Sequence, residues 1–407
     1  MTVPYNSYIH TVTFAGFFNL LLKWNGSVYK LLWRTMLIYA IIYALIAVIY
    51  HLCLTRDFKI LFERMFDYFN MFQENIPVSF VLGFYVSCIV GRWWEQFNAL
   101  PHPTRLAIYV TSHIRGTDDR TRLVRRTIMR YACLGYVLTM VTVCGPAKKR
   151  FPTYKHMIKA GIHSLISGFM LSSEGKILDN LITHFNKYYV PFVWASTLVA
   201  QARKDNMIKD DFAYHCLLDE LNFLRRKCQM ILNYDWINIP LVYTQVATMA
   251  VYIFFVSCLI SRQHIPVYTD TGEMIVPLFT FLQFLFYMGW LKVAEELINP
   301  FGEDDDDFEI NPMIDKNFKV GYMIVDEMHG ACPSLVKDQY WDTTDVQMPY
   351  TEAALPFYKD PGLLGSANLV EYFFCLVLFL EALFYKVNNF VACLCCSFES
   401  LMFGRNE

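Results

Sequence analysis

The chain has 407 residues, of which 55% are hydrophobic and only 18% are charged. Soluble domains carry about 25% charged residues, so this composition is typical of a membrane protein. The formal net charge of −2 excludes the strongly basic balance that a nucleic-acid-binding protein needs.

Four apolar segments are long enough to cross a bilayer, which takes about 20 helical residues. Basic residues flank the first segment, whereas the loop after the third has only Arg262 before a Pro/Thr/Asp/Gly turn. Because cytosolic loops are enriched in lysine and arginine, this pattern predicts a cytosolic N-terminus. The predicted spans cover approximately residues 33–52, 76–94, 237–260 and 275–291.

The stretch between the second and third spans has mixed charge and helical periodicity, as in 210–232, so we expect amphipathic cytosolic helices there. The predicted class is an all-α membrane protein with a large helical cytosolic region. The predicted parts are a cytosolic N-terminal segment (1–32), two spans (33–100), the cytosolic helical region (101–228), two further spans (229–296), an acidic loop with a cytosolic C-terminal region (297–365), and an apolar tail (366–407).

An acidic run directly follows the fourth predicted span. Six carboxylates fall within the seven residues 303–309. Such a run can be a solvated turn, or it can bind a hard divalent cation that relieves the repulsion between its charges. Oxygen-only ligands favour calcium over softer metals.

A stripe of large apolar residues marks the second span. Phe72, Ile76, Phe80 and Phe84 follow one another at a spacing of four, which places them along one side of a helix. The stripe is compatible with a helix-packing face or with the apolar wall of a pore. Nucleotide-binding loops, zinc-site spacings and hydrolase or kinase motifs are absent from the sequence, so we do not expect an enzyme.

Several long strings resemble the bestrophin family, and the resemblance extends over about residues 1–360. The strings are 76–85, 92–94, 149–152, 239–246, 289–295, 298–309 and 325–329. The resemblance implies a homopentameric, calcium-activated chloride channel with four transmembrane helices per subunit around one central pore. We expect it in the plasma membrane, with internal membranes as the alternative. Chloride is then the permeant ion, calcium the regulatory ion, and the lipid bilayer a partner.

The resemblance also implies roles for individual residues. The pore neck corresponds to Ile76, Phe80 and Phe84, and a second constriction, the cytosolic aperture, to Phe212. The side-chain ligands of calcium correspond to Asp304 and Asp307. The backbone carbonyl ligands correspond to His10, Glu296 and Asn299.

Three features depart from the family pattern. Glu95 stands where asparagine is usual, which adds a negative charge near an anion path. The segment 142–146 differs from the usual Ser/Thr/Val-rich stretch, and the tail after about residue 365 is apolar rather than polar.

Two other classes stay open: an ion-coupled transporter, which usually shows paired halves, and a membrane scaffold that regulates calcium channels or stores.

Overall fold

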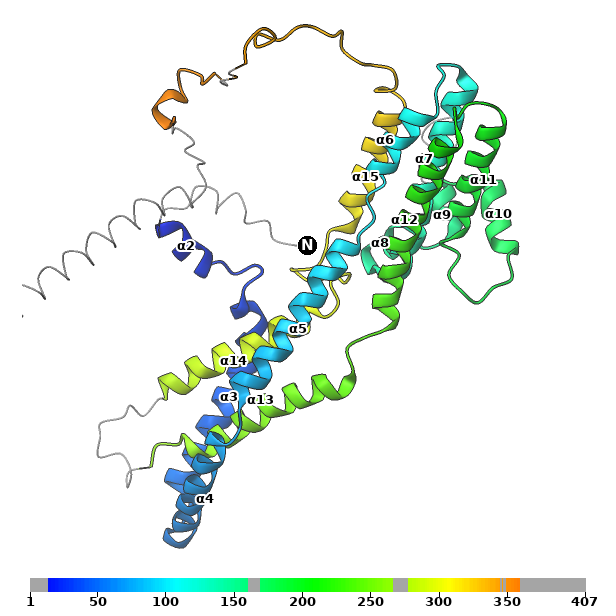
Figure 1. Ribbon diagram of the computed structural model, residues 1–407. Helices are drawn as coiled ribbons and strands as arrows, with labels where there is room; N and C mark the ends of the chain where they lie inside the picture. Colours follow the sequence, from blue (N-terminus) through cyan, green and yellow to red (C-terminus); the bar gives the residue numbers. More distant parts are fainter. Residues whose placement is uncertain (1–13, 160–168, 266–276, 345, 347–348, 359–407) are drawn as a thin grey trace, which may run out of the picture. The chain divides into compact units, whose positions relative to one another are not determined.

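The computed structural model describes residues 14–344 apart from 160–168 and 266–276, together with residue 346 and residues 349–358. In these residues the chain is helical, with one isolated β-bridge between Ile114 and Ile208 (Figure 1). The elements are, in chain order, α2 (Phe14–Leu21), α3 (Val28–Val48), η1 (Ile49–Cys53), α4 (Arg56–Glu74), α5 (Val78–Ala99), α6 (Thr104–His113), α7 (Asp119–Val143), α8 (Gly145–Arg150), α9 (Tyr154–Lys159), α10 (Ser172–Asn180), α11 (Val190–Lys204), α12 (Asp211–Trp236), α13 (Leu241–Ser261), α14 (Leu278–Leu297), α15 (Ile310–Val325) and η2 (Leu355–Phe357).

The chain divides into two units, Met1–Cys332 and Pro333–Glu407. In the described residues, the first unit holds every element from α2 to α15, and the second holds the short 3-10 turn η2. The predicted apolar tail 366–407 lies outside the described residues.

Two helices in the described part of the chain are long and apolar enough to cross a membrane. They are Val28–Cys53, which combines α3 with the π-helical turn η1, and α13. Both correspond to predicted spans. Ser27 caps the N-terminus of α3: its hydroxyl accepts a hydrogen bond from the Lys30 amide at 3.3 Å and so satisfies one of the free amides of the first turn.

The second predicted span is broken at its start. Residues 56–73 and 78–113 count together as a third possible span, bent by 47° at the break. Pro77 lies at the break, where its missing amide proton makes a continuous helix unfavourable. The fourth predicted span corresponds to α14, which does not reach the same apolar length, because Gln283, Lys292 and Glu295 interrupt it.

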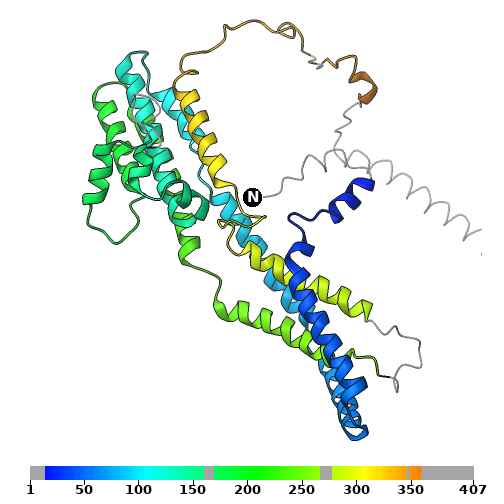
Figure 2. The same ribbon diagram turned by 180° about the vertical axis from the view of Figure 1, so that it is seen from behind.

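A cluster that we call the span core joins α3, α5, α13 and α14. Its buried members from α5 are Val78, Leu82, Tyr85, Val86 and Ile89, which recur at helical spacing along one side. Because α14 packs on both α3 and α5, and α13 packs on both α4 and α5, one face of α5 is covered by its own chain. Figure 2 shows α5 crossing α13 and α14 within this group.

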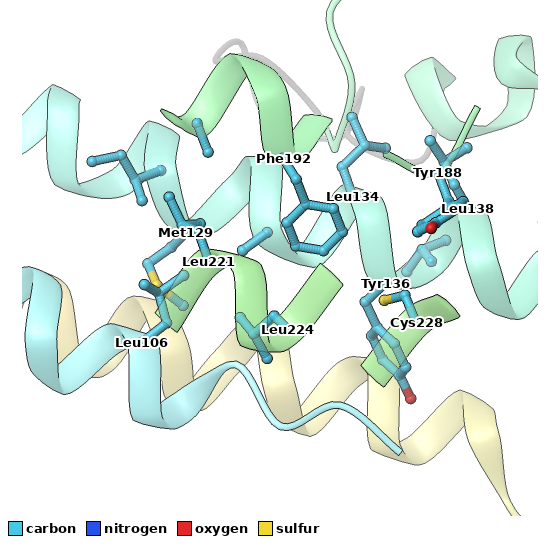
Figure 3. Packing of buried hydrophobic residues seen from close by; sticks show 14 of the residues in the cluster. Leu106, Met129, Leu134, Tyr136, Leu138, Tyr188, Phe192, Leu221, Leu224 and Cys228 are labelled. Carbon is cyan, nitrogen blue, oxygen red and sulfur yellow. The ribbon is translucent and has the colours of Figure 1, made fainter. Parts of the chain in front are cut away.

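A second cluster, the body core, fills the space between α6, α7, α11, α12 and α15. The central part of α7 is buried on all sides, which requires helices around it. Figure 3 shows Phe192 of α11 against Leu134 of α7, with Leu221 and Leu224 of α12 nearby. The predicted amphipathic helix 210–232 is confirmed as α12, and its leucines face this core.

Candidate functional site

The acidic run forms the loop between α14 and α15, and two aromatic residues anchor its ends. Phe301 and Phe308 are 4% and 8% exposed. The ring of Phe308 lies 5.2 Å from that of Trp93 and 5.5 Å from that of Phe97, both on α5. The Phe308 amide also donates to the Pro300 carbonyl at 2.8 Å, so the loop is held against α5 rather than free in solvent.

The two aspartates predicted as side-chain ligands lie together in this loop. Asp307 is only 5% exposed, and its Oδ2 accepts a hydrogen bond from the Asp304 amide at 2.6 Å. The Asp307 amide in turn donates to the Asp304 carbonyl at 3.3 Å. This pair of bonds closes a tight turn that carries one buried and one exposed carboxylate.

Gly302 leaves room for the buried carboxylate. A β-carbon added at this position would lie 2.7 Å from Oδ2 of Asp307 and 3.6 Å from the carbonyl oxygen of Asn299. The carboxylate and the carbonyl therefore border the same small space, which any side chain at residue 302 would invade. The structure thus brings together two of the predicted ligands, Asn299 and Asp307.

A cavity of about 250 Å³ opens beside the loop, against the start of α3. Its lining combines Gly26, Ser27 and Lys30 from the α3 end with five carboxylates, namely Glu296, Glu303, Asp304, Asp305 and Asp306. Asp305 forms an ion pair with Lys30 and accepts a hydrogen bond from the Gly26 amide at 3.1 Å. Residues 275 positions apart are thereby tied together, and Glu296 is placed at the same cavity.

The electrostatics of the loop are uneven. The ammonium of Lys30 and the Gly26 amide lower the pKa of Asp305. Burial and the neighbouring carboxylates raise the pKa of Asp306 and of Asp307. The charge of Asp305 is therefore neutralised by Lys30. In contrast, the environment of the loop disfavours the ionised forms of Asp306 and Asp307.

The donors around this space are oxygens, which suits a hard cation such as calcium. In the part of the chain that the structure describes, no group of three or more His, Cys, Asp or Glu side chains is arranged to hold a metal. A calcium ion here would thus draw on carbonyl oxygens such as that of Asn299 as well as on Asp304 and Asp307. His10, the remaining predicted ligand, lies outside the described residues.

The predicted neck residues lie at the start of α5. Phe80 and Phe84 are 65% and 60% exposed, and their ring centroids are 4.8 Å apart. They project from the side of α5 opposite the span core. Ile76 precedes the helix and is half-buried. The expectation that Phe72 continues the same helical stripe is wrong, because Phe72 belongs to α4 and the chain breaks before α5 begins.

Phe212, the predicted aperture residue, lies in the first turn of α12 and is 78% exposed. Asp210 caps this helix by accepting a hydrogen bond from the Ala213 amide at 2.8 Å, which fixes the position of the turn. The side chain of Phe212 therefore projects into solvent from a fixed backbone.

Sequence reasoning missed several residues of the site. Gly302 carried a turn signal in Asn-Pro-Phe-Gly. This signal identifies a loop, but not the small space between the Asp307 carboxylate and the Asn299 carbonyl. The Lys30–Asp305 pair and the ion pair of Lys149 with Glu303 join segments far apart in the sequence, and local patterns give no signal for such contacts.

Known proteins are similar to this chain in sequence and in fold. The family model described as "Bestrophin, RFP-TM, chloride channel" matches residues 1–327. Bestrophin-2 of Mus musculus is 49% identical over 370 residues, which cover 90% of this chain and 72% of that protein. Human Bestrophin-1 is 46% identical over 373 residues, which cover 91% of this chain and 63% of that protein.

Among solved structures, a bacterial bestrophin homologue from Klebsiella pneumoniae superposes with a TM-score of 0.55 at 17% identity, covering 73% of this chain and 99% of that one. At this identity the superposition shows the shared fold. The sequence matches show the family: the chain belongs to the bestrophins, a family of membrane chloride channels and not a class of enzymes. The resemblance found in the sequence is confirmed.

Proposed function

We propose that this protein is a calcium-activated chloride channel in which calcium bound at the acidic loop opens an apolar neck. The observation that carries the proposal is the space beside Gly302, where the buried Asp307 carboxylate and the Asn299 carbonyl lie together. Their oxygens are hard donors, and the loop holds charge that a cation would relieve. The calcium site comprises Asp304 and Asp307 with backbone carbonyls of His10, Glu296 and Asn299.

The acidic loop is in direct contact with the neck helix α5, so calcium binding in the loop can be coupled to the neck. Phe308 of the loop packs on Trp93 and Phe97, and both belong to the helix that carries Phe80 and Phe84. A change in the loop on binding calcium would therefore press on α5. Calcium favours opening only to the extent that it binds the open arrangement more tightly.

The neck requires several copies of the chain. Ile76, Phe80 and Phe84 from each copy form the constriction, and Phe212 forms a second one on the cytosolic side. A ring of apolar side chains can stop ion flow by expelling water, and the positive edges of phenylalanine rings suit a weakly hydrated anion. We propose a homopentamer in the plasma membrane, with four spans per subunit and a cytosolic N-terminus.

The test is the calcium response of Asp304→Ala in patch-clamp recordings with stepped cytosolic calcium. Loss of a charged ligand is expected to raise the half-activating calcium concentration by roughly tenfold or more, or to abolish activation, since a tenfold change is only about 1.4 kcal/mol of binding free energy. The matched control is Asp315→Ala, which removes an exposed carboxylate of α15 that pairs with Arg150. An unchanged response of Asp304→Ala would defeat the assignment of the loop.

A further inference from the structure

The exposed side of α5 continues well beyond the neck. Cys88, Gly91 and Glu95 are all exposed. At 3.6 residues per turn, these three and the pair Phe80 and Phe84 fall within an arc of roughly 80° around the helix. The opposite side of α5 is buried in the span core. The helix therefore presents one continuous open face from the neck to a carboxylate.

We propose that Glu95 lines the ion path on the cytosolic side of the neck and reduces the preference of the channel for anions. The proposal rests on the proposed function, because it assumes that the face of Phe80 and Phe84 lines the pore. Glu95 follows Phe84 by 11 residues, which is about 16 Å along the helix axis. Since the Debye length is about 10 Å at 0.1 M salt, the carboxylate acts on ions at its own level rather than at the neck.

The charge of Glu95 is held in place but not neutralised. Its Oε2 accepts a hydrogen bond from the Tyr234 hydroxyl of α12 at 3.0 Å. Among the described residues, no Lys, Arg or His nitrogen lies within 4.0 Å of its carboxylate. Arg92 donates instead to the carbonyls of Tyr234 and Ile237 and lies 5.1 Å from the centre of the Tyr234 ring.

A fixed charge of one sign in a narrow passage changes the local ion concentration, because low-dielectric walls focus its field. Each subunit that contributes α5 to the pore adds one such carboxylate. The effect is to lower the chloride concentration at this level and to raise that of cations. Glu95→Gln removes the charge, and its amide oxygen can still accept the hydrogen bond from Tyr234.

The experiment uses the full chain, purified and reconstituted in planar bilayers under a KCl gradient at saturating calcium. In about 0.05 M salt, Glu95→Gln is expected to raise the single-channel conductance roughly twofold and to move the reversal potential towards that of chloride. In about 1 M salt, where the Debye length is only about 3 Å, the difference from the wild-type channel should disappear.

Two variants separate charge from structure. Asp235→Asn removes an exposed carboxylate next to Tyr234 that is not on α5, and it should leave the reversal potential unchanged. Tyr234→Phe removes the hydrogen bond and keeps the charge of Glu95. A conductance change in Tyr234→Phe equal to that of Glu95→Gln, or a salt-independent effect, would overturn the proposal.

The proposal would also be overturned if Glu95→Gln changed neither the conductance nor the reversal potential. Recordings of Phe84→Ala in parallel then show whether the role of Glu95 or the proposed neck is wrong. If Phe84→Ala changes conduction or gating and Glu95→Gln does not, the pore wall stands and the role of Glu95 falls. If neither variant has an effect, the proposed neck itself is wrong. If Glu95→Gln does not assemble, the wild-type channel decides: its chloride selectivity must rise with ionic strength, and a constant selectivity contradicts the proposal.

Discussion

The acidic loop and the open face of α5 differ in what completes them. The loop is completed within one chain, because Phe308 packs on α5 and Lys30 pairs with Asp305. In the part of the chain that the structure describes, the face of α5 with Phe80 and Phe84 is exposed. A buried, internally bonded loop can be analysed in a single subunit, whereas the proposed role of the exposed apolar face depends on contacts between copies.

The largest expected effect concerns the neck. Alanine at Ile76, Phe80 and Phe84 together removes most of the apolar side-chain volume from the proposed constriction. Because a wide passage stays hydrated, we expect chloride current in calcium-free solution, where the proposed gating predicts a closed wild-type channel. Inside-out patches with a calcium chelator measure this current. If the triple variant still closes fully without calcium, the gate lies elsewhere and the open face of α5 has another role.

The second prediction addresses the loop through its backbone. Gly302→Ala places a β-carbon 2.7 Å from Oδ2 of Asp307 and so displaces the buried carboxylate. We expect the half-activating calcium concentration to rise roughly tenfold, with the maximal current preserved, since about 1.4 kcal/mol of ligand misplacement suffices. Gly321→Ala is the matched control, because an added β-carbon there lies 3.1 Å from the flexible end of the Met129 side chain and Gly321 lies on α15, outside the loop. Equal calcium responses of the two variants would contradict the proposal that the space left by Gly302 positions the Asp307 carboxylate for calcium.

The sequence predicted the elements whose signal is local. The apolar lengths of α3 and α13 and the helical periodicity of α12 were sufficient, because both signals are local in the sequence. The acidic run was also visible, but its pattern alone left open whether it is a solvated turn or a site for a hard cation. The family resemblance supplied the proposed role of Asp307, and the structure added its burial and its hydrogen bond from the Asp304 amide.

Other features depended on tertiary contacts or on a local break. Of the four apolar residues in the predicted stripe, only Phe80 and Phe84 lie on α5. The half-buried Ile76 precedes the helix and Phe72 belongs to α4, because the helix is broken at Pro77. The Lys30–Asp305 pair links two segments that only the folded chain brings together. Spacing rules describe one helix at a time, so neither result could be read from them.

The last prediction concerns the contribution of the acidic loop to the stability of the folded chain. The pKa values of Asp306 and Asp307 are raised by burial and by neighbouring carboxylates. The folded chain thus binds these protons more tightly than the unfolded chain does. The stability they contribute is present below about pH 4 and is lost as the pH rises through the raised pKa values.

Asp307→Asn removes this titration and retains an oxygen that can accept from the Asp304 amide. At pH 7.5 with a calcium chelator, we expect the variant to unfold roughly 2 °C above the wild-type protein, and the difference should vanish near pH 4. With calcium present the order should reverse, because only the wild-type loop gains a bound ion. Asp305→Asn, which loses the Lys30 ion pair, should show no such gain. Thermal unfolding of the purified protein measures all three. An Asp307→Asn variant less stable than wild type in chelator would mean that the buried carboxylate stabilises the loop without a cation.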